Sequence, residues 1–457
     1  MFLILIFSNI NCSGISTSKT SNLNVSDNYD LIIITPYKFY NSLQPLAKHK
    51  NDVGVKTKIY FVETIYNFFE GRDQAEQIKY FIKYAIENME TKYVLLVGDI
   101  YNIPIRKAYS LFLSDKREYV LSDHYYADIY NETDEFCSWD SNNNNKFGEI
   151  EILNDEDPPF EPRCINCWNT VINITDIDGV DLYPDVAVGR LPCSNKREVD
   201  VVVTKIIKYE NTVYGQSWFK KIVLAGGDGH PEFEGNEGEE TSNDIIEQLP
   251  DFEHVCLFTS ENNLNARKFN RAINQGAGFV SYNGHGYVFS WGTYPPNGDE
   301  MITYLAYNVK LLRNMNKLPI IFFNACLTSR LDYTLGLFIT INPLKLLPRF
   351  LKLLPRFNDD TILPCLAWQF VKKRYGGAIA TLGSTELAYS YNVHGKSYAG
   401  YAMLAVLFFK NYYEGATLGE MFISAQQEYL DNVILDYMTL EEFILIGDPS
   451  LRVGGYP

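Results

Sequence analysis

Short apolar runs alternate with amphipathic stretches in the N-terminal part of the chain. Residues 31–36 form an apolar run with the length of one strand, and residues 57–62 and 93–99 resemble it. Runs of this kind are typical of strands buried on both sides in a parallel sheet. Residues 73–89 place Ile and Phe side chains at the spacing of one helix face. The order strand, helix, strand, helix, strand predicts an α/β fold with helices on both faces of a parallel sheet.

A second set of predicted strands and helices follows a segment in which the alternation of apolar runs and amphipathic stretches stops. Residues 130–180 are rich in Asn, Asp, Pro and Cys, and we expect a long surface excursion there. Beyond it the pattern predicts a helix near 195–213 and strands at 185–190, 221–228, 278–282, 318–323 and 377–382. A boundary near residue 215 divides the chain into α/β units at residues 29–215 and 216–457.

Two predicted strands of the C-terminal unit end in residues that can do chemistry. The strand at 278–282 leads into Asn-Gly-His-Gly, which contains His285, and the strand at 318–323 leads into Asn-Ala-Cys, which ends at Cys326. In open parallel sheets, active-site groups collect at the carboxyl ends of strands. We therefore expect His285 and Cys326 to emerge side by side from neighbouring strands.

This pair of side chains fits nucleophilic catalysis. A free thiol has a pKa near ~8.5, so an imidazole nearby must raise the thiolate fraction or take the proton as attack occurs. The backbone N–H groups of Gly286 and Cys326 are the candidate donors to the oxyanion. The alternative is structural, because a cysteine on a buried strand is usually a small hydrophobe and a lone histidine usually packs.

The composition and net charge of the chain limit the classes of partner that it can bind. The 457 residues are 46% hydrophobic and 21% charged, which excludes a disordered chain. The formal net charge of −16 makes nucleic acid a poor partner and favours divalent cations or cationic peptides.

The N-terminal residues 1–28 begin with an apolar stretch and then turn polar. They are either the remnant of a signal peptide or a frayed apolar end. No run approaches the ~20 apolar residues of a membrane span. We expect a secreted or cell-envelope protein.

Residues 140–151 fit a twelve-residue calcium loop in which Asn145 replaces the usual glycine at position 6. Asn tolerates the left-handed conformation that this position needs. Structural Ca²⁺ is therefore possible, with no cofactor needed for catalysis, and the alternative is an Asn-rich turn without an ion. The candidate ligands are Asp140, Asn142, Asn144, Lys146 (through its carbonyl) and Glu151.

Two further features stand out. Four of the eight cysteines crowd into one region and would form two disulfides in an exported protein, or a four-thiolate zinc site: Cys137, Cys164, Cys167 and Cys193. Residues 344–357 repeat the heptamer Leu-Lys-Leu-Leu-Pro-Arg-Phe, which we interpret as a duplication in a surface loop because proline would interrupt a helix in every repeat.

Several motifs together resemble the gingipain family of cysteine peptidases, in the clan of caspases and legumains. The resemblance covers roughly residues 30–455. Besides the His285 and Cys326 motifs, it rests on Leu-Val-Gly-Asp at 96–99, Ser-Asp-His-Tyr-Tyr-Ala-Asp at 122–128, Tyr-Pro-Asp to Gly-Arg at 183–190, Gly-Gly-Ala-Ile-Ala at 376–380 and Gly-Asp-Pro-Ser-Leu at 447–451.

The resemblance implies a caspase-like α/β unit of two subdomains with a Cys326–His285 dyad in the second. It makes Asp123 the candidate acid that orients the histidine. It also places Asp181 in the pocket for an Arg or Lys side chain before the scissile bond, although a loop Asp making a local turn explains that residue equally well. The residues from Thr328 to Phe357 depart from the family, which is usually shorter there.

The sequence therefore predicts a cysteine endopeptidase that acts on protein or peptide substrates through a thioester. The rival hypotheses are a catalytically inactive, calcium-stabilised binding protein and a zinc hydrolase. The oligomeric state is not predicted.

Overall fold

A computed structural model describes residues 28–111, 117–152, 163–164, 174–176, 178–232, 235–341, 360–393, 395–434 and 436–457. Three features of the sequence lie outside these residues: the apolar N-terminal stretch, the repeated heptamer and Cys167. Within the described residues, no helix combines the length and the apolar character needed to cross a bilayer.

One ten-stranded sheet runs through the molecule. Both predicted units contribute strands to it. The two sets of strands meet where Ile446 of one unit pairs with Arg190 of the other. In sheet order its strands are β11 (Glu253–Phe258), β10 (Lys221–Gly226), β12 (Phe279–Asn283), β16 (Ile320–Asn324), β17 (Ala380–Ser384), β21 (Phe443–Ile446), β9 (Ala187–Leu191), β3 (Tyr93–Val97), β1 (Leu31–Thr35) and β2 (Thr57–Phe61).

The predicted parallel order holds within each half of the sheet. Strands β11, β10, β12, β16 and β17 are parallel to their neighbours, as are β9, β3, β1 and β2. Strand β21 is antiparallel to β17. Its four-residue apolar sequence gives no sign of direction, so the sequence did not predict this exception.

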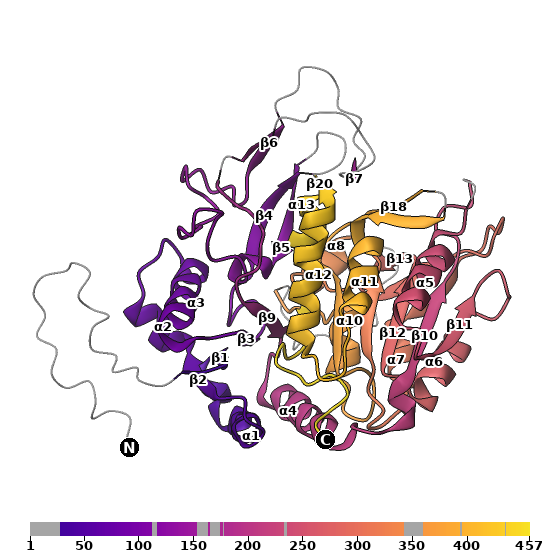
Figure 1. Cartoon of the computed structure of the whole chain (residues 1–457), viewed down its shortest axis with the longest axis horizontal. Helices are drawn as coiled ribbons and strands as arrows, with labels where there is room; N and C mark the ends of the chain where they lie inside the picture. The colour runs from indigo at the N-terminus through magenta and orange to yellow at the C-terminus, as the bar shows by residue number, and fades with distance from the viewer. Residues whose placement is uncertain are drawn as a thin grey trace, which may run out of the picture.

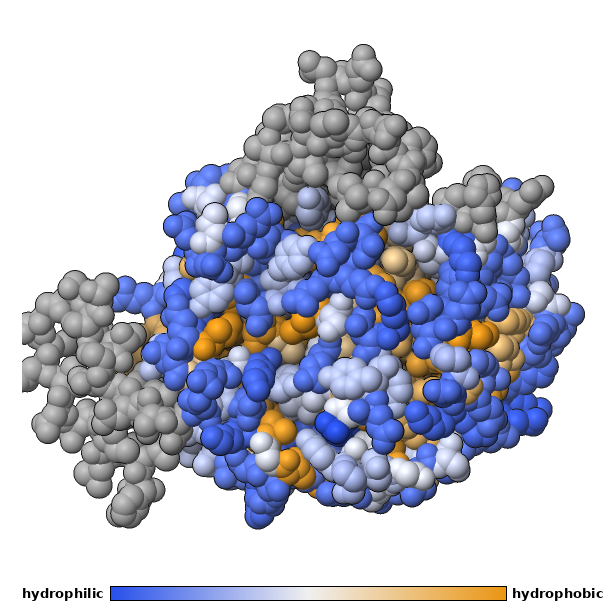
Figure 2. All heavy atoms as spheres, viewed as in Figure 1, coloured by the Kyte–Doolittle hydropathy of each residue, from blue (hydrophilic) through white to orange (hydrophobic). Residues whose placement is uncertain are grey.

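Helices cover both faces of the sheet (Figure 1). On one face α11 (Gly400–Lys410) packs between α5 (Glu237–Gln248) and α12 (Leu418–Asn432). Elsewhere α1 (Tyr40–Asp52) packs against α4 (Lys196–Thr212), α6 (Ala266–Gln275) packs against α7 (Ala306–Val309), and α10 (Leu366–Val371) packs against α7 and β17. In Figure 2 the surface toward the viewer is mainly hydrophilic, with smaller groups of hydrophobic residues exposed among the hydrophilic ones.

The remaining elements form small sheets and short helices around this core. They are α2 (Val62–Phe68), α3 (Gln74–Met89), β4 (Arg106–Leu111) with β5 (Arg117–Ser122), β6 (Ile150–Ile152) with β8 (Ile174–Asp176), β7 (Arg163–Cys164) with β20 (Val433–Ile434), β13 (His285–Tyr287) with β14 (Ser290–Thr293) and β15 (Ile302–Leu305), α8 (Leu335–Ile341), β18 (Ser390–Val393) with β19 (Lys396–Ala399), α13 (Tyr437–Glu442), and the 3₁₀ turns η2 (Tyr37–Phe39), η3 (His124–Tyr126) and η4 (Ser217–Lys220).

The segment predicted as a surface excursion is partly core. Trp139 is fully buried, and its ring packs edge-on against Tyr125 with centroids 5.6 Å apart. Its indole N–H donates to the carboxylate of Asp128 at 2.9 Å. The polar composition around Trp139 hid this anchor, because one aromatic residue does not create a periodic pattern.

A buried cluster of charges ties α1, α4 and the C-terminal segment together. The Lys50 ammonium lies 2.7 Å from Glu210 and 2.9 Å from Asp448, and all three side chains are fully buried or nearly so. Burial alone would raise the pKa of Glu210, but the charge of Lys50 and hydrogen bonds from His49 and Lys50 outweigh it and hold that pKa below its usual range. Asp448 belongs to the Gly-Asp-Pro-Ser-Leu motif, whose role here is structural.

Replacing the cation of this cluster tests its contribution to stability. Lys50→Met leaves two buried carboxylates without their cation, so we expect the free energy of unfolding at pH 7 to fall by about 3–5 kcal/mol. In the wild type, the lowered pKa of Glu210 contributes stability that is present above the unfolded-state pKa of ~4.3 and is lost as the pH falls through the folded-state value. In the variant this dependence reverses, because protonation then relieves the buried carboxylates.

Urea unfolding at pH 7 and pH 4.5 measures both effects. The control is Lys48→Met on the same helix, since Lys48 is 75% exposed and pairs with Asp52 at the surface. Equal stability of the two variants at pH 7 would contradict the structural role of the cluster.

Candidate active site

His285 and Cys326 come from neighbouring parallel strands at matching heights. Asn283 of β12 pairs with Asn324 of β16, and each functional residue follows two positions later. The backbones touch there, since a Cβ built on Gly286 would lie 2.1 Å from the carbonyl oxygen of Cys326. Only glycine allows this approach. The structure therefore contains the neighbouring strands that the sequence predicted.

A network of buried polar side chains lies beneath this pair. The amide of Asn324 donates to Ser281 Oγ at 3.1 Å and also to the side-chain oxygen of Asn283. The amide of Asn283 donates to Ser242 Oγ at 2.8 Å, which connects β12 to α5. Buried hydrogen-bonded amides are costly to separate, so the network fixes the ends of β12 and β16 relative to each other.

The Cys326 thiol is half-buried and contacts backbone groups. Its sulfur lies 3.3 Å from both the carbonyl oxygen and the N–H nitrogen of Ala388. Burial raises the pKa of this thiol to about 11, with a smaller contribution from the carboxylate of Glu442. The N–H groups of Ala388, Cys326 and Gly286 act on the sulfur and oppose the rise. At neutral pH the resting group is therefore a thiol, which needs a base in order to react.

His285 is oriented by a backbone carbonyl. Its Nε2 lies 2.6 Å from the oxygen of Gly229, in the loop that follows β10. A carbonyl oxygen can only accept, so Nε2 carries the proton and Nδ1 is the basic nitrogen. The rings of His230 and Tyr294 stand edge-on to the imidazole, with centroids 5.4 and 6.3 Å away. A neutral imidazole in this tautomer can receive a proton only at Nδ1.

Asp123 lies elsewhere and does not orient His285. Its two carboxylate oxygens accept from the Arg190 guanidinium at 2.7 and 2.6 Å, and both side chains are buried. Arg190 belongs to β9, and strands β16, β17 and β21 separate β9 from β12. The same guanidinium donates to the carbonyl of Ile103 at 2.8 Å. The structure therefore corrects the expected contact between Asp123 and the histidine: the acid anchors an arginine.

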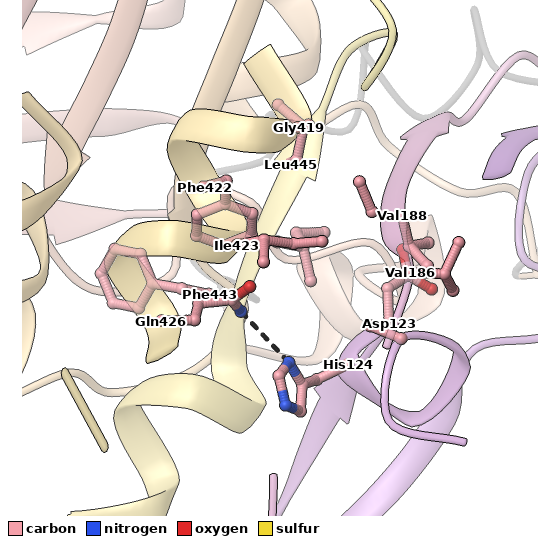
Figure 3. A pocket seen from close by; sticks show the side chains of 13 residues that line it. Asp123, His124, Val186, Val188, Gly419, Phe422, Ile423, Gln426, Phe443 and Leu445 are labelled. Carbon is pink, nitrogen blue, oxygen red and sulfur yellow. Dashed lines mark hydrogen bonds between the residues drawn. The ribbon is translucent and has the colours of Figure 1, made fainter. Parts of the chain in front are cut away.

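The cavity beside Asp123 is also structural (Figure 3). His124 points toward α12, where its Nδ1 lies 3.1 Å from the amide nitrogen of Gln426, while its Nε2 lies 2.7 Å from the carbonyl oxygen of Leu182. Burial lowers the pKa of His124 to about 4, so the ring is neutral. The cavity measures about 20 Å³, enough for one water rather than a peptide side chain.

Asp181 sits in a turn before β9. Its carboxylate accepts the backbone N–H of Tyr183 at 2.9 Å, and Leu182 between them has a left-handed φ of 60°. This is the local turn that the sequence offered as the alternative. The carboxylate is nevertheless half-buried, and its role in binding a basic side chain stays a prediction.

The described part of the expected calcium loop is held by its own hydrogen bonds. Asp140 and Asn142 each accept the backbone N–H of Asn144 at 2.9 Å, and the side chain of Asn144 accepts the N–H of Lys146 at 2.8 Å. Asn145 has a φ of 65°, the left-handed conformation expected at position 6.

The charge of this loop is already compensated in part. Asp140 is buried and pairs with the guanidinium of Arg72. Glu151 lies in β6, but its side chain is outside the described residues. Within the described part of the chain, no group of three or more His, Cys, Asp or Glu side chains is arranged to hold a metal. The calcium site stays a prediction.

The cysteine cluster is only partly described. Cys193 follows β9, is fully buried and forms no disulfide with another described residue. Cys137 is buried, and its Sγ lies 3.1 Å from the carbonyl oxygen of Gly179. The backbone of Cys164 lies in β7. The choice between disulfides and zinc remains open.

Sequence reasoning missed the residues that surround the pair. Gly229 follows β10 in the run Gly-Gly-Asp-Gly-His, which is a signal, because glycines and an acid at the end of a parallel strand mark a possible site. Ala388 and Glu442 carry no comparable signal. Their positions follow from how the loop after β17 and the helix before β21 pack.

Comparison with known proteins identifies the family and the fold of the chain. The model of peptidase family C25 matches residues 24–454. Gingipain R2 of Porphyromonas gingivalis is 23% identical over 318 residues, which cover 68% of this chain and 34% of that protein. Lys-gingipain HG66 of the same organism is 26% identical over 162 residues, which cover 34% of this chain and 9% of that protein. The chain thus spans about a third or less of these relatives.

Solved structures show the same fold. The complex of the RgpB pro- and mature domains of Porphyromonas gingivalis matches with a TM-score of 0.60 and 19% identity, over 93% of this chain and 79% of that chain. The crystal structure of the Arg-specific cysteine proteinase gingipain R matches with a TM-score of 0.59 and 20% identity, over 93% and 78%. The expected caspase-like α/β fold is confirmed.

The ion pair of Asp123 yields a prediction that separates stability from catalysis. Asp123→Asn leaves the buried Arg190 guanidinium without its anion, so we expect the free energy of unfolding to fall by about 3–5 kcal/mol in urea titrations. The folded variant should alkylate Cys326 with iodoacetamide at the wild-type rate. The exposed Asp251→Asn serves as the control. Unchanged stability together with slower alkylation of Cys326 would contradict the structural role of Asp123 and would indicate that it orients His285.

Proposed function

Because the chain belongs to peptidase family C25, we propose that it is a cysteine endopeptidase in which Cys326 is the nucleophile and His285 the general base. One observation carries the proposal. The two residues follow register-matched positions of adjacent parallel strands, with backbone N–H groups gathered at the sulfur. The substrates would be proteins or peptides. We place the activity outside the cytoplasm because of the apolar N-terminal stretch.

The first half of the reaction follows from the two side chains. The Cys326 thiol gives its proton to Nδ1 of His285 as the sulfur attacks the peptide carbonyl carbon, since a thiol with a pKa of about 11 is not ionised beforehand. The N–H groups of Gly286 and Cys326 donate to the oxyanion. His285 then returns the proton to the amide nitrogen, the C–N bond breaks, the amine leaves and a thioester remains.

The second half regenerates the enzyme. Water attacks the thioester carbonyl while Nδ1 of His285 takes a proton from it. The C–S bond breaks, the sulfur recovers its proton from the imidazolium and the carboxylic acid departs. Throughout the cycle Nε2 keeps its proton on the carbonyl of Gly229, which holds the ring in one orientation.

Asp181 is the proposed partner of an Arg or Lys side chain before the scissile bond. The support is its carboxylate together with the resemblance around the Gly-Arg motif. One similar structure is described as Arg-specific and one similar protein as a Lys-gingipain. Either preference is therefore open for this chain.

Alkylation kinetics test the dyad without a known substrate. We expect iodoacetamide to label Cys326 faster than Cys256, the other half-buried cysteine among the described residues. His285→Ala should slow labelling of Cys326 at pH 7 by at least tenfold and leave Cys256 unchanged. In that variant the rate should rise about tenfold per pH unit toward the thiol pKa of about 11, because only ionisation then supplies the thiolate.

The same experiment addresses the rival function. Equally slow labelling of Cys326 in the wild type and in His285→Ala would favour an inactive binding protein that keeps the fold. Inhibition of peptide hydrolysis by a chelator but not by thiol reagents would favour a zinc hydrolase.

A random peptide library tests the specificity residue. Asp181→Asn should reduce kcat/KM for cleavage after Arg or Lys by about 10- to 100-fold, because the cationic side chain loses its charged partner. Asp431→Asn is the matched control, since Asp431 is exposed and accepts the Tyr183 hydroxyl at 2.7 Å in the same region. Cleavage that is indifferent to Arg and Lys in the wild type would remove Asp181 from the site.

A further inference from the structure

Charge is distributed unevenly along this acidic chain. Although the formal net charge is −16, residues 262–331 and 361–385 contain ten Lys and Arg residues and only two acidic ones, Asp299 and Glu300. These ranges include α6, α7, α10 and the loops that lead into β16 and β17. In the fold, α7 contacts both α6 and α10, so the basic segments come together (Figure 1). Positive charge is therefore gathered on one part of a negatively charged protein.

We call six cationic side chains on these elements the basic patch. They are Arg271, Lys310, Arg313, Lys317, Lys373 and Arg374, of which all but the half-buried Lys373 are exposed. Within the described part of the chain none of the six pairs with a carboxylate. Instead, Lys317 donates to the carbonyl of Gln275 and Lys373 to that of Lys310, each at 3.1 Å. Burial lowers the pKa of Lys373, and the nearby charge of Arg313 lowers it further, so the cations lie close enough to repel one another.

Large apolar side chains are exposed among these cations. They are Tyr307, Leu311, Met315 and Tyr375. Met315 is 55% exposed and has a left-handed φ of 51°, so neither packing nor backbone preference explains a methionine there. The Arg374 guanidinium lies 5.1 Å from the centre of the Tyr375 ring. Cations interspersed with aliphatic and aromatic side chains are typical of surfaces that bind the interface of a membrane.

A buried asparagine holds the patch in shape. Asn314 is buried, and its amide nitrogen donates to the carbonyls of Lys317 at 2.7 Å and Gly377 at 2.8 Å, while its side-chain oxygen accepts the N–H of Gly377 at 2.8 Å. These bonds join the loop before β16 to the loop before β17. The side chain of Asn274 in α6 accepts the N–H of Arg313 at 2.7 Å. The backbone that carries the cations is therefore already ordered, which lowers the entropic cost of binding.

We infer that the basic patch docks this protein onto the surface of a bilayer that contains anionic phospholipids. The cations pair with the lipid phosphates, and Leu311 and Met315 enter the boundary between headgroups and acyl chains. A hydrophilic polyanion such as nucleic acid matches the charges but gains nothing from exposed aliphatic side chains, so the observations favour a lipid surface. At physiological ionic strength charges are screened beyond about 8 Å, so acidic residues elsewhere on the protein do not prevent docking.

Docking at this patch leaves the proposed catalytic pair facing away from the membrane. Lys317 precedes β16 and Cys326 follows it, so they lie at opposite ends of a strand roughly 16 Å long. Lys373 and Arg374 likewise precede β17, which is parallel to β16. The inference adds a location to the proposed peptidase but does not depend on its chemistry.

Co-sedimentation of the full chain with vesicles tests the inference. We expect binding to vesicles of phosphatidylcholine mixed with phosphatidylglycerol, little binding to phosphatidylcholine alone, and weaker binding as the salt concentration rises. The triple variant Arg271→Glu, Lys310→Glu, Arg374→Glu should bind the anionic vesicles more weakly by about tenfold or more. These side chains are exposed, so the fold should be retained, which near-UV circular dichroism checks.

Two further variants complete the design. Lys56→Glu, Lys107→Glu, Lys410→Glu changes the net charge by the same amount at exposed lysines outside the patch and should bind like the wild type. Leu311→Gln with Met315→Asn keeps every cation, and Asn tolerates the left-handed conformation. It should bind anionic vesicles about threefold to tenfold more weakly but inorganic polyphosphate as well as the wild type does, because only the bilayer offers an apolar region.

Equal binding of the wild type to anionic and neutral vesicles would overturn the inference, and so would equal losses in the two charge-reversal variants. Undiminished vesicle binding by Leu311→Gln with Met315→Asn would also overturn it and would indicate a site for soluble polyanions. Iodoacetamide should alkylate Cys326 at the same rate with and without anionic vesicles, whereas protection of Cys326 would contradict the orientation. None of these outcomes requires peptidase activity.

Discussion

The in-register pairing of β12 with β16 is the constraint on which the rest of the site depends. Asn283 and Asn324 are direct neighbours in the sheet, and their buried amides are bonded to each other. Because of this pairing, His285 and Cys326, each two positions after its asparagine, follow the two strands at the same level of the sheet. Gly286 makes the contact possible, since any side chain there would collide with the backbone of Cys326. A slip of one residue in either strand would turn His285 or Cys326 toward the opposite face.

Charges are arranged differently in the framework and in the site. In the framework, the buried carboxylates of Glu210 and Asp123 are each paired with a buried cation, Lys50 or Arg190. Near the thiol, Glu442 accepts from the hydroxyl of Ser384, and in the loop whose Gly229 carbonyl contacts His285, Asp228 accepts a backbone N–H. Burial, with a smaller contribution from Glu442, raises the pKa of the Cys326 thiol and so disfavours a preformed thiolate. The proposed mechanism is therefore general-base catalysis, in which the thiol keeps its proton until the substrate arrives.

The sequence predicted the elements that periodicity controls. The apolar runs located β1, β3, β12 and β16, and residues 195–213 correctly predicted α4, whose first turn is capped by Asn195. The adjacency of the strands that lead into His285 and Cys326 was predictable for the same reason, because parallel strands bring their carboxyl ends together.

The failures have physical causes. Asp123 carries the chemistry of a catalytic acid, but its partner Arg190 is 67 residues away along the chain, and nothing local announces the pair. Trp139 is an isolated anchor in a polar segment.

Trapping the acyl-enzyme tests the central claim most directly, because a thioester on Cys326 is what distinguishes this chemistry from binding or metal-assisted hydrolysis. The wild type would be mixed with an ester of an Nα-acylated arginine, quenched in acid within milliseconds to seconds, digested and analysed by mass spectrometry. The account predicts the acyl mass on the peptide that contains Cys326, absent in Cys326→Ala and strongly reduced in His285→Ala. Turnover of the ester without an acyl group on Cys326, or with equal acylation in His285→Ala, would contradict it.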